Sequence, residues 1–232
     1  MQNWKMTDHA RDEILGKLKA APPTQTPARP AVPPLHELAW SRQEMVDNFV
    51  ENLTLLGCAV HRVADLQEVL EKMAEIARAQ GLTKIAVSED DVVTPLDLAG
   101  WGKRNGVEVF TRRDGQDREG FKRIVFEEVQ AGVTGVDFAV AESGTLCLVH
   151  DERQPRLISI APIWHIAVVP AERIRPVYEL VMQDLFAQRG RIPHHVTLIS
   201  GPSMTADIQA TLFTGMHGPK NVTVILVDLQ PT

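Results

Sequence analysis

The chain has 232 residues, 44% of them hydrophobic, and a formal net charge of −6 at pH 7. This composition supports a packed core and excludes a disordered chain, while the negative charge argues against nucleic acid or an anionic membrane as the main partner. No apolar run approaches the roughly 18 residues of a membrane helix, and the polar N-terminus lacks the apolar segment of a signal peptide. We therefore expect a cytoplasmic protein without a membrane span.

The N-terminal part of the chain predicts a helix followed by a linker. Asp8 to Ala20 carries apolar residues at helical spacing, and the proline-rich stretch from Ala21 to Pro34 favours an extended, semi-rigid segment. We expect residues 1–34 to lie outside the core, docked on the body or on another subunit. Residues 35–232 are predicted to form one α/β domain.

Helical and strand patterns then alternate along the chain. Helices are predicted over Arg42–Leu56 and Leu66–Gln80, the second ended by Gly81. Short apolar runs predict strands at Cys58–Val63, Lys84–Val87 and Val107–Phe110. This alternation is typical of a mainly parallel sheet flanked by crossover helices.

The second half of the chain predicts five more strands, at Phe138–Ala141, Leu146–Val149, Trp164–Val169, Val196–Ile199 and Val222–Val227. Three further elements are predicted beside them. They are a hairpin that pairs the second of these strands with Arg156–Ala161, a long helix over Ala171–Gln188, and a short helix that starts at Ser203 or Thr205.

Three segments follow predicted strands: Glu142 to Thr145, the Val169–Pro170 junction, and Ser200 to Asp207. Since ligands of open α/β sheets gather outside the carboxyl ends of the strands, we expect these segments to meet at one edge. The first and third are rich in glycine and hydroxyl groups, which suits a pocket for a phosphate, a carboxylate or a nucleotide. The alternative is that small residues only turn the chain tightly. The candidate ligand-binding residues are Ser143, Gly144, Thr145, Ser200, Gly201, Ser203, Thr205 and Asp207.

Two side chains are candidates for catalysis. Glu142 follows an apolar run, and partial burial would raise its pKa toward that of a base or nucleophile; alternatively it caps a helix or pairs with a basic residue. His217 lies in a glycine-flanked loop, where it titrates near neutrality, donates to a ligand or only contacts water. Asp207, in the first turn of the short predicted helix, should stay ionised and either hold a hydroxyl, a cation or an arginine, or only strengthen the helix N-terminus.

The remaining chemistry-bearing residues predict no metal or redox centre. Cys58 and Cys147 each lie in an apolar stretch and are predicted to be buried thiols, too few to hold a four-thiolate iron–sulfur cluster. His165 lies in an apolar strand and is predicted to be a hydrogen-bonded core histidine. The sequence contains no Cys-x-x-Cys, G-x-G-x-x-G, Walker or G-x-S-x-G motif.

Four strings in the last hundred residues resemble the LUD-domain family. They are Gly132-Val-Thr-Gly-Val-Asp-Phe-Ala-Val-Ala-Glu-Ser-Gly-Thr145, Ile199-Ser-Gly-Pro-Ser-Met-Thr-Ala-Asp-Ile208, Gly215-Met-His-Gly-Pro219 and Val224-Ile-Leu-Val-Asp228. The length, the N-terminal helix and the proline-rich leader are most similar to the lactate utilization C group of that family.

The chain departs from the family pattern at two positions of these strings. Met204 stands where the family often has arginine, and Ser143 where threonine is common. The first departure removes a positive charge from the Ser200 to Asp207 turn, which weakens the case for tight phosphate binding there.

The resemblance implies a fold similar to the ribose-5-phosphate isomerase and CoA-transferase-like group. It also implies a role in oxidising L-lactate to pyruvate, together with iron–sulfur lactate utilization proteins as partners. This chain would be the cluster-free subunit, with no cofactor of its own and a site for a small carboxylate or phosphate-bearing ligand. The alternative is a stand-alone acyl/CoA-transferase-like or phospho-sugar enzyme using Glu142, because Ala141-Glu142-Ser143-Gly144 is similar to the Ser-Glu-Asn-Gly loop of some CoA transferases.

Overall fold

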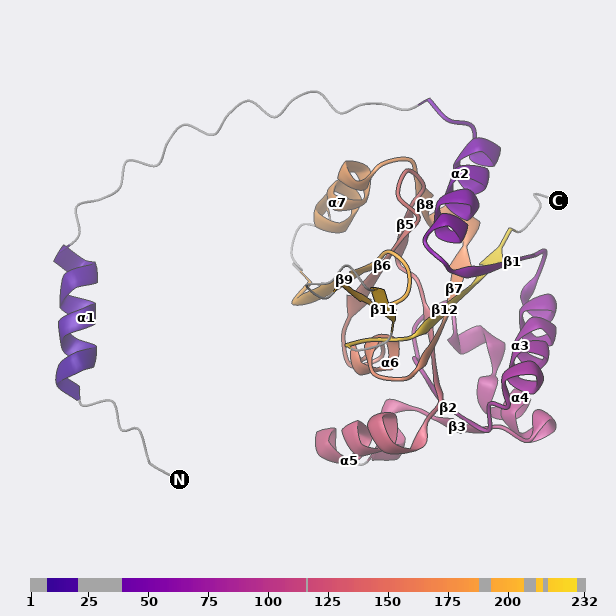
Figure 1. Ribbon diagram of the computed structural model, residues 1–232, viewed down its shortest axis with the longest axis horizontal. Helices are drawn as coiled ribbons and strands as arrows, with labels where there is room; N and C mark the ends of the chain where they lie inside the picture. Colours follow the sequence, from indigo (N-terminus) through magenta and orange to yellow (C-terminus); the bar gives the residue numbers. More distant parts are fainter. Residues whose placement is uncertain are drawn as a thin grey trace. The chain divides into compact units, whose positions relative to one another are not determined.

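The computed structural model describes residues 8–20, 39–115, 117–187, 193–206, 212–214 and 217–228. The chain divides into two units, residues 1–35 and 36–232, which we describe separately. The first contains helix α1 (Asp8–Ala20), which confirms the predicted N-terminal helix (Figure 1). Ile14 and Leu18 of this helix are exposed. The predicted linker over 21–34, and its boundary with the body, lie outside the described residues.

Six parallel strands form the main sheet of the second unit, in the order β1-β12-β7-β4-β2-β3 (Figure 1). The strands are β1 (Ala59–Val63), β2 (Lys84–Val87), β3 (Glu108–Phe110), β4 (Ala131–Gly135), β7 (Trp164–Pro170) and β12 (Asn221–Val227). The predicted parallel α/β sheet is therefore confirmed. Of these six strands, β4 alone was not predicted from the sequence, because its two glycines lower the strand propensity of the segment.

The helices of the body are α2 (Arg42–Leu55), α3 (Leu66–Gln80), α4 (Leu98–Asn105), α5 (Arg118–Arg123), α6 (Leu157–Ile160) and α7 (Tyr178–Ala187). Ser41 and Glu44 form a reciprocal capping box at the start of α2. Gly81 ends α3 in the left-handed region with φ of 63°, as predicted.

Four short helical turns lie between these elements. They are the 3-10 turns η1 (Thr94–Leu96), η2 (Arg112–Gly115) and η4 (Ala171–Arg173) and the π-helical turn η3 (Ile124–Glu128).

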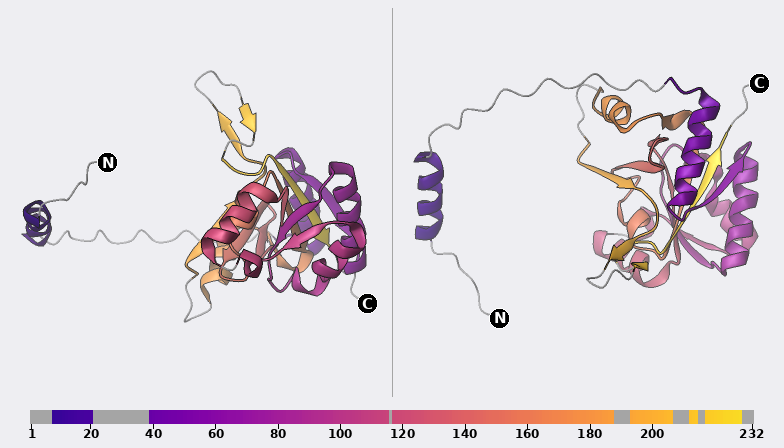
Figure 2. Two further views of the ribbon diagram at one scale, coloured as in Figure 1. Left: turned by 90° about the horizontal axis from the view of Figure 1, so that it is seen from below. Right: turned by 45° about the horizontal axis from the view of Figure 1, so that its top comes forward.

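A second, mixed sheet has the order β8-β5-β6-β9. Its strands are β8 (Ile174–Arg175), β5 (Phe138–Val140), β6 (Thr145–His150) and β9 (His195–Ile199). The strands β10 (Met204–Ala206) and β11 (Leu212–Thr214) pair antiparallel with each other and stand away from both sheets (Figure 2).

Three sequence predictions are wrong in this region. Arg156–Ala161 does not pair with β6: it contains α6, and β6 pairs with β5 and β9 instead. The helix expected from Ala171 begins only at Tyr178, because Pro176 cannot donate within a helix and disfavours helical geometry in the residue before it. The short helix expected from Ser203 or Thr205 does not form at Met204–Ala206 or at Leu212, because these residues belong to the paired strands β10 and β11; residues 207–211 lie outside the described residues.

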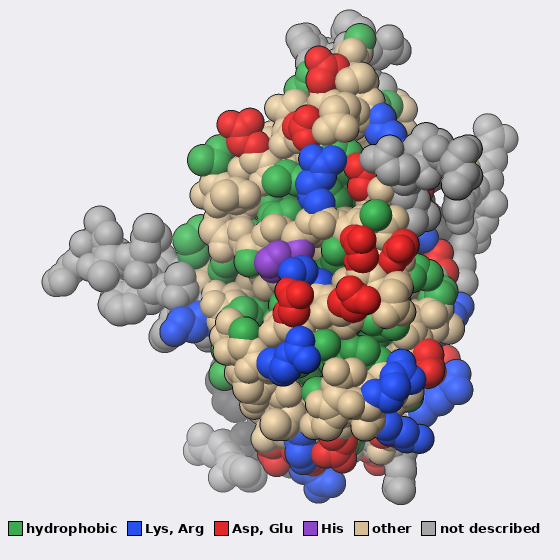
Figure 3. All heavy atoms as spheres, turned by 90° about the vertical axis from the view of Figure 1, so that its right-hand side faces the viewer, with side chains coloured by type: hydrophobic (Ala, Val, Ile, Leu, Met, Phe, Trp, Pro, Cys, Tyr) green, Lys and Arg blue, Asp and Glu red, His purple; other side chains and the backbone are tan. Residues whose placement is uncertain are grey.

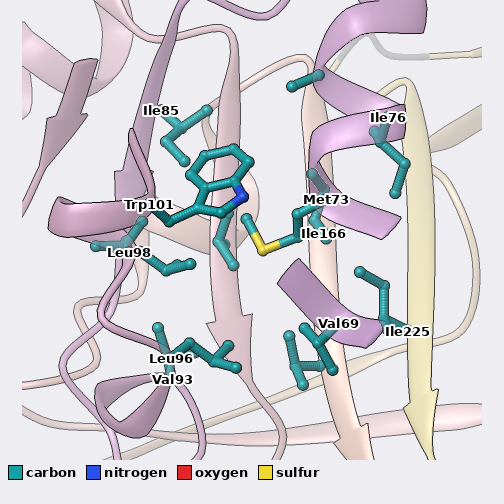
Figure 4. Packing of buried hydrophobic residues seen from close by; sticks show 14 of the residues in the cluster. Val69, Met73, Ile76, Ile85, Val93, Leu96, Leu98, Trp101, Ile166 and Ile225 are labelled. Carbon is teal, nitrogen blue, oxygen red and sulfur yellow. The ribbon is translucent and has the colours of Figure 1, made fainter. Parts of the chain in front are cut away.

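The two faces of the parallel sheet are covered differently. Helices α3 and α4 pack on one face, where Met73, Ile85, Trp101 and Ile166 are buried together (Figure 4). On the other face, α2 and the strands β5 and β6 bury a second cluster, and α7 packs on the outer side of the second sheet. Alternate residues of β7 contribute to the two clusters, as the period of a strand requires.

The surface on the side of β1 and α3 mixes acidic and basic side chains without a large patch of one sign (Figure 3). Arg62 bridges Asp47 and Asp228, and Lys72 pairs with Glu75. Within the part of the chain that the structure describes, no helix is both long enough and apolar enough to cross a membrane.

Candidate functional site

The two hydroxyl-rich turns predicted from the sequence meet in the structure. Thr145 Oγ1 lies 2.7 Å from Ser200 Oγ, and Ser143 Oγ lies 2.8 Å from Thr145 Oγ1. Thr145 is buried, whereas Ser143 and Ser200 are exposed. The three hydroxyl groups therefore form one hydrogen-bonded line that runs between exposed residues across a buried threonine.

The glycines of these turns bring the chain against the end of α2. Gly144 has φ of +59°, and a Cβ there would lie 2.7 Å from Leu53 N. Gly201 has φ of +94°, and a Cβ there would lie 2.9 Å from Leu56 O. Both positions need glycine for their backbone conformation and for packing on α2. This close approach accounts for the two glycines without a ligand.

The prediction that these turns lie at the carboxyl edge of the parallel sheet is wrong. Glu142 to Thr145 connects β5 with β6, and Ser200 follows β9, so both turns belong to the second sheet. Only the Val169–Pro170 segment ends a strand of the parallel sheet. The sequence shows each strand end but not which sheet the strand joins.

Glu142 caps a helix in the structure. Its Oε1 accepts a hydrogen bond of 2.9 Å from the backbone N–H of Tyr178, the first residue of α7. A carboxylate at this position accepts from an N–H group that has no partner within the helix, and its negative charge is stabilised by the positive N-terminal end of the helix dipole. The partial burial predicted for Glu142 is wrong, since the residue is exposed. Its catalytic role stays a prediction.

The other predicted site residues are not all described. Ser203 N donates to Pro219 O at 2.9 Å, which places the Gly218–Pro219 turn beside Ser203, and His217 just before that turn is exposed. Thr205 belongs to β10, and its side chain is outside the described atoms. Asp207 lies outside the described residues altogether.

A different set of polar residues lies at the carboxyl edge of the parallel sheet. From β2 the chain passes to β3 on one side; from the neighbouring strand β4 it passes through β5 and β6 of the second sheet and re-enters the parallel sheet at β7, on the other side. Such a reversal is the switch point where open α/β sheets bind ligands. The segments that follow β2, β4 and β7 carry Asp90, Asp137 and Arg173.

Asp90 ties the ends of β2 and β4 together. Its Oδ1 accepts from the N–H groups of Val92 and Val93 at 2.8 and 3.0 Å, and its Oδ2 accepts from Gly135 N at 2.9 Å and from the hydroxyl of Ser88. A Cβ on Gly135 would lie 2.2 Å from Asp90 Oδ1, so only glycine fits there. Asp90 therefore has a structural role as the acceptor that fixes this edge.

Asp137 is the half-buried carboxylate of this edge. Its Oδ2 accepts from Val149 N at 2.8 Å and, at 3.4 Å, from the side-chain amide of Gln154. Burial raises its pKa to about 6, although the Val149 N–H and the Arg173 charge oppose this shift. A half-buried carboxyl group with this pKa exchanges protons near neutrality, which is typical of functional acids and bases.

Arg173 brings the only positive charge among these three edge residues. Its Nη1 donates to Val136 O at 3.0 Å, and its Nη2 lies 2.5 Å from Asp91 Oδ2. About a quarter of the Arg173 side chain is exposed (24%), whereas Asp91 is mostly exposed (69%). Arg173 and Asp137 influence each other by charge but form no direct ion pair.

Two buried histidines lie on β6 and β7. His150 contacts Gln154 O through Nδ1 at 3.1 Å and Thr197 Oγ1 through Nε2 at 2.7 Å, and His165 Nε2 lies 2.9 Å from Thr134 Oγ1. Burial lowers the pKa of His150 and lowers that of His165 to about 4, so both rings are neutral at pH 7. His165 is buried as predicted, but its Nδ1 has no hydrogen-bond partner among the described residues.

The thiols and carboxylates of the described residues form no metal centre. Cys58 and Cys147 are both buried and free, and burial raises the pKa of their thiols to about 11 and about 12. No group of three histidine, cysteine, aspartate or glutamate side chains in this part of the chain is placed to hold a metal ion.

The family model of the LUD domain matches residues 46–227. The chain belongs to the LUD domain family. The matched residues include the hydroxyl line and the carboxyl edge of the parallel sheet, whereas α1 lies outside the match.

Curated relatives of this LUD domain are named lactate utilization protein C. The one from Halalkalibacterium halodurans is 29% identical over 195 residues, which cover 81% of each chain. The one from Macrococcus caseolyticus is 38% identical over 107 residues, 45% of this chain and 46% of the relative. A crystal structure of a DUF162 family protein from Deinococcus radiodurans matches with a TM-score of 0.57 over 81% of this chain and 99% of the other, at 24% identity, and supports the fold alone.

Sequence reasoning missed the carboxyl-edge residues of the LUD domain. Asp137 stands inside the Gly132 to Thr145 string, but without β4 as a predicted strand it has no recognisable place at a strand end. Asp90 follows the correctly predicted β2 within a Ser-Glu-Asp-Asp run, and this was the usable signal. Arg173 was assigned to the first turn of a long predicted helix, which concealed its place in the turn after β7.

Proposed function

We propose that this LUD domain protein is the cluster-free, cytoplasmic subunit of an L-lactate utilization system. In that system lactate is oxidised to pyruvate, and iron–sulfur partner proteins accept the electrons. One observation carries the proposal: the match to a protein named lactate utilization protein C extends over 81% of both chains.

The chemistry of the chain supports a role without an electron-transfer cofactor of its own. Iron–sulfur clusters are generally held by four thiolates, and this chain has two cysteines in all. Both are buried, with thiols whose pKa values lie far above neutrality. The electrons would therefore pass to clusters in the partner proteins.

We further propose that the chain supplies a binding site for a small carboxylate. An arginine and a half-buried carboxyl group at the switch point of the parallel sheet support this role. The parallel sheet flanked by helices, with its smaller second sheet, also supports a relationship to the ribose-5-phosphate isomerase and CoA-transferase-like fold. A stand-alone enzyme using Glu142 has less support, because this carboxylate caps α7.

Reconstitution tests the proposed function. The full chain is co-expressed with cysteine-rich proteins encoded beside its gene, and lactate-dependent reduction of a dye is measured with and without the chain. We expect the complete set to reduce the dye, and neither the partners alone nor this chain alone to do so. Equal rates in the presence and absence of the chain, or lactate oxidation by the chain alone, would contradict the proposal.

A further inference from the structure

We propose that the carboxyl edge between β2, β4 and β7 binds a 2-hydroxycarboxylate monoanion, with the carboxylate on Arg173 and the hydroxyl group on Asp137. This inference rests on the proposed function for its ligand class, and on the geometry of this edge for its location. It assigns a site that the predicted hydroxyl-rich turns, on the second sheet, do not provide.

Arg173 suits a carboxylate because a hydrogen bond to the backbone holds its guanidinium in place. The hydrogen bond from Nη1 to Val136 O at 3.0 Å orients the planar group at the end of β4. A guanidinium presents parallel N–H groups that match the two oxygens of a carboxylate. Its partner in the structure, Asp91, is mostly exposed to solvent, so this ion pair is weak and a ligand carboxylate can replace it.

Asp137 suits the oxygen on carbon 2 of such a ligand, because the carboxyl group can hydrogen-bond this oxygen both as an alcohol and as a ketone. When ionised, Asp137 accepts a hydrogen bond from an alcohol; when protonated, it donates one to a ketone. A pKa of about 6 makes both forms accessible near neutrality. The same side chain is therefore complementary to a 2-hydroxy acid and to the corresponding 2-oxo acid.

Neither Arg173 nor Asp137 is bound to the other side chain. Arg173 and Asp137 interact by charge without forming a direct ion pair, so neither neutralises the other. Asp90 behind them is saturated by backbone and hydroxyl donors and holds the ends of β2 and β4 in register. Hydrogen bonds to Asp90 therefore hold the backbone at the ends of β2 and β4, next to the proposed site.

The balance of charge favours a monoanion over a phosphate ester. The positive charge of Arg173 lies among the carboxylates of Asp90, Asp91 and Asp137. A phosphate ester near pH 7 carries close to two negative charges and would be repelled by this acidic surrounding. A small carboxylate carries one negative charge and can place its hydroxyl group, rather than a second charge, toward Asp137.

Calorimetric titration of the purified full chain tests the inference with two matched ligands. L-Lactate and propionate share a three-carbon carboxylate, but only lactate carries the hydroxyl group. We expect lactate to bind roughly 10-fold or more tightly than propionate, because a site built to hydrogen-bond a hydroxyl group rejects the analogue that lacks it. Inorganic phosphate should bind more weakly than lactate. Equal binding of lactate and propionate, tighter binding of phosphate, or no binding of lactate would overturn the inference.

Substitutions assign the contacts. Arg173→Gln should weaken lactate binding by roughly 10-fold or more, because a charge-assisted, two-pronged contact is lost. Asp91→Asn should strengthen it, since the competing counter-ion is removed. Asp137→Asn should reduce the preference for lactate over propionate. Arg104→Gln, at an exposed arginine of α4, is the control and should leave the affinity unchanged.

Two further measurements separate a misfolded variant from a failed inference, and the site from the function. If Arg173→Gln does not fold, Arg173→Lys keeps the charge without the fork, and Asp91→Asn tests the same guanidinium by a gain in affinity. Unchanged affinity in Arg173→Lys and Asp91→Asn would overturn the site. If the reconstituted system requires the chain but Arg173→Gln supports full lactate oxidation, the proposed site is contradicted and the proposed function is retained. If lactate binds through Arg173 but the system oxidises lactate without the chain, the proposed function is contradicted and the proposed site is retained.

Discussion

Thr145 Oγ1 and Ser200 Oγ, 55 positions apart in the chain, lie 2.7 Å from each other. Their contact joins the turn between β5 and β6 to the turn after β9, across the antiparallel pairing of β6 with β9. Both turns also reach the end of α2 through a glycine. The most specific string of the sequence is thus partly explained by packing of the second sheet on this helix.

Replacing these glycines by alanine should destabilise the protein. Gly144→Ala and Gly201→Ala each place a Cβ under 3.0 Å from the α2 backbone, in addition to the strain of positive φ. We expect a loss of roughly 2–4 kcal/mol in the free energy of unfolding, about 1 kcal/mol of it from the backbone conformation. Urea denaturation measures this loss.

Gly57→Ala is the matched control for these two variants. Gly57 has a similar φ of +84°, but a Cβ there would meet no atom within 4 Å. Gly57→Ala should therefore lose only the part of the unfolding free energy that comes from backbone strain. Equal losses at Gly57, Gly144 and Gly201 would show that the contact with α2 has no energetic importance.

Asp90 and Asp91 are adjacent in the sequence but should differ sharply in their effect on stability. Asp90→Ala leaves two loop N–H groups and Gly135 N without an acceptor, which should cost about 2–4 kcal/mol. Asp91→Ala removes one exposed ion pair and should change stability by less than about 1 kcal/mol. Chemical denaturation of both variants measures the difference, and similar values would contradict the structural role assigned to Asp90.

The sequence was sufficient where a local pattern decides the structure. The period of apolar residues in α3 and the left-handed Gly81 gave this helix with its true bounds, and β2 and β12 follow from their apolar runs. It was insufficient where tertiary pairing decides: Met204–Ala206 has a good helix-start sequence and forms a strand because β11 lies beside it. The candidate site shows the same division. That the hydroxyl-rich turns meet was predicted, but the assignment of strands to two sheets, which decides what lies at the carboxyl edge, is a long-range property.

Glu142 allows a direct test between a structural and a catalytic carboxylate. Glu142→Ala removes the acceptor for Tyr178 N and should destabilise the protein by about 1 kcal/mol, as the loss of a helix cap does. Glu142→Gln keeps an oxygen acceptor and should stay closer to the parent in stability. If the carboxylate only caps α7, the reconstituted system with Glu142→Gln should oxidise lactate at about the parent rate. Loss of turnover in this variant at unchanged stability would instead support a catalytic role for Glu142.

The buried His165 and the half-buried Asp137 should make stability depend on pH in opposite directions. For His165 the pKa falls from 6.5 to about 4 on folding, so its contribution is complete above pH 6.5 and is lost as the pH falls toward 4. For Asp137 the pKa rises from 3.8 to about 6, so its contribution is complete below pH 3.8 and is lost as the pH rises through 6.

The two contributions therefore oppose each other between about pH 4 and pH 6, and removing one should reveal the other. Asp137→Asn should lose more unfolding free energy between pH 7 and pH 4.5 than the parent chain, by up to roughly 2 kcal/mol after allowance for the solvent exposure of Asp137. His165→Gln should lose less than the parent over the same range. Urea denaturation at the two pH values measures both changes. The same pH dependence in the parent and both variants would show that these groups do not control the acid stability, whereas opposite changes would confirm that the ring is buried neutral and the carboxyl group binds its proton more tightly in the folded state.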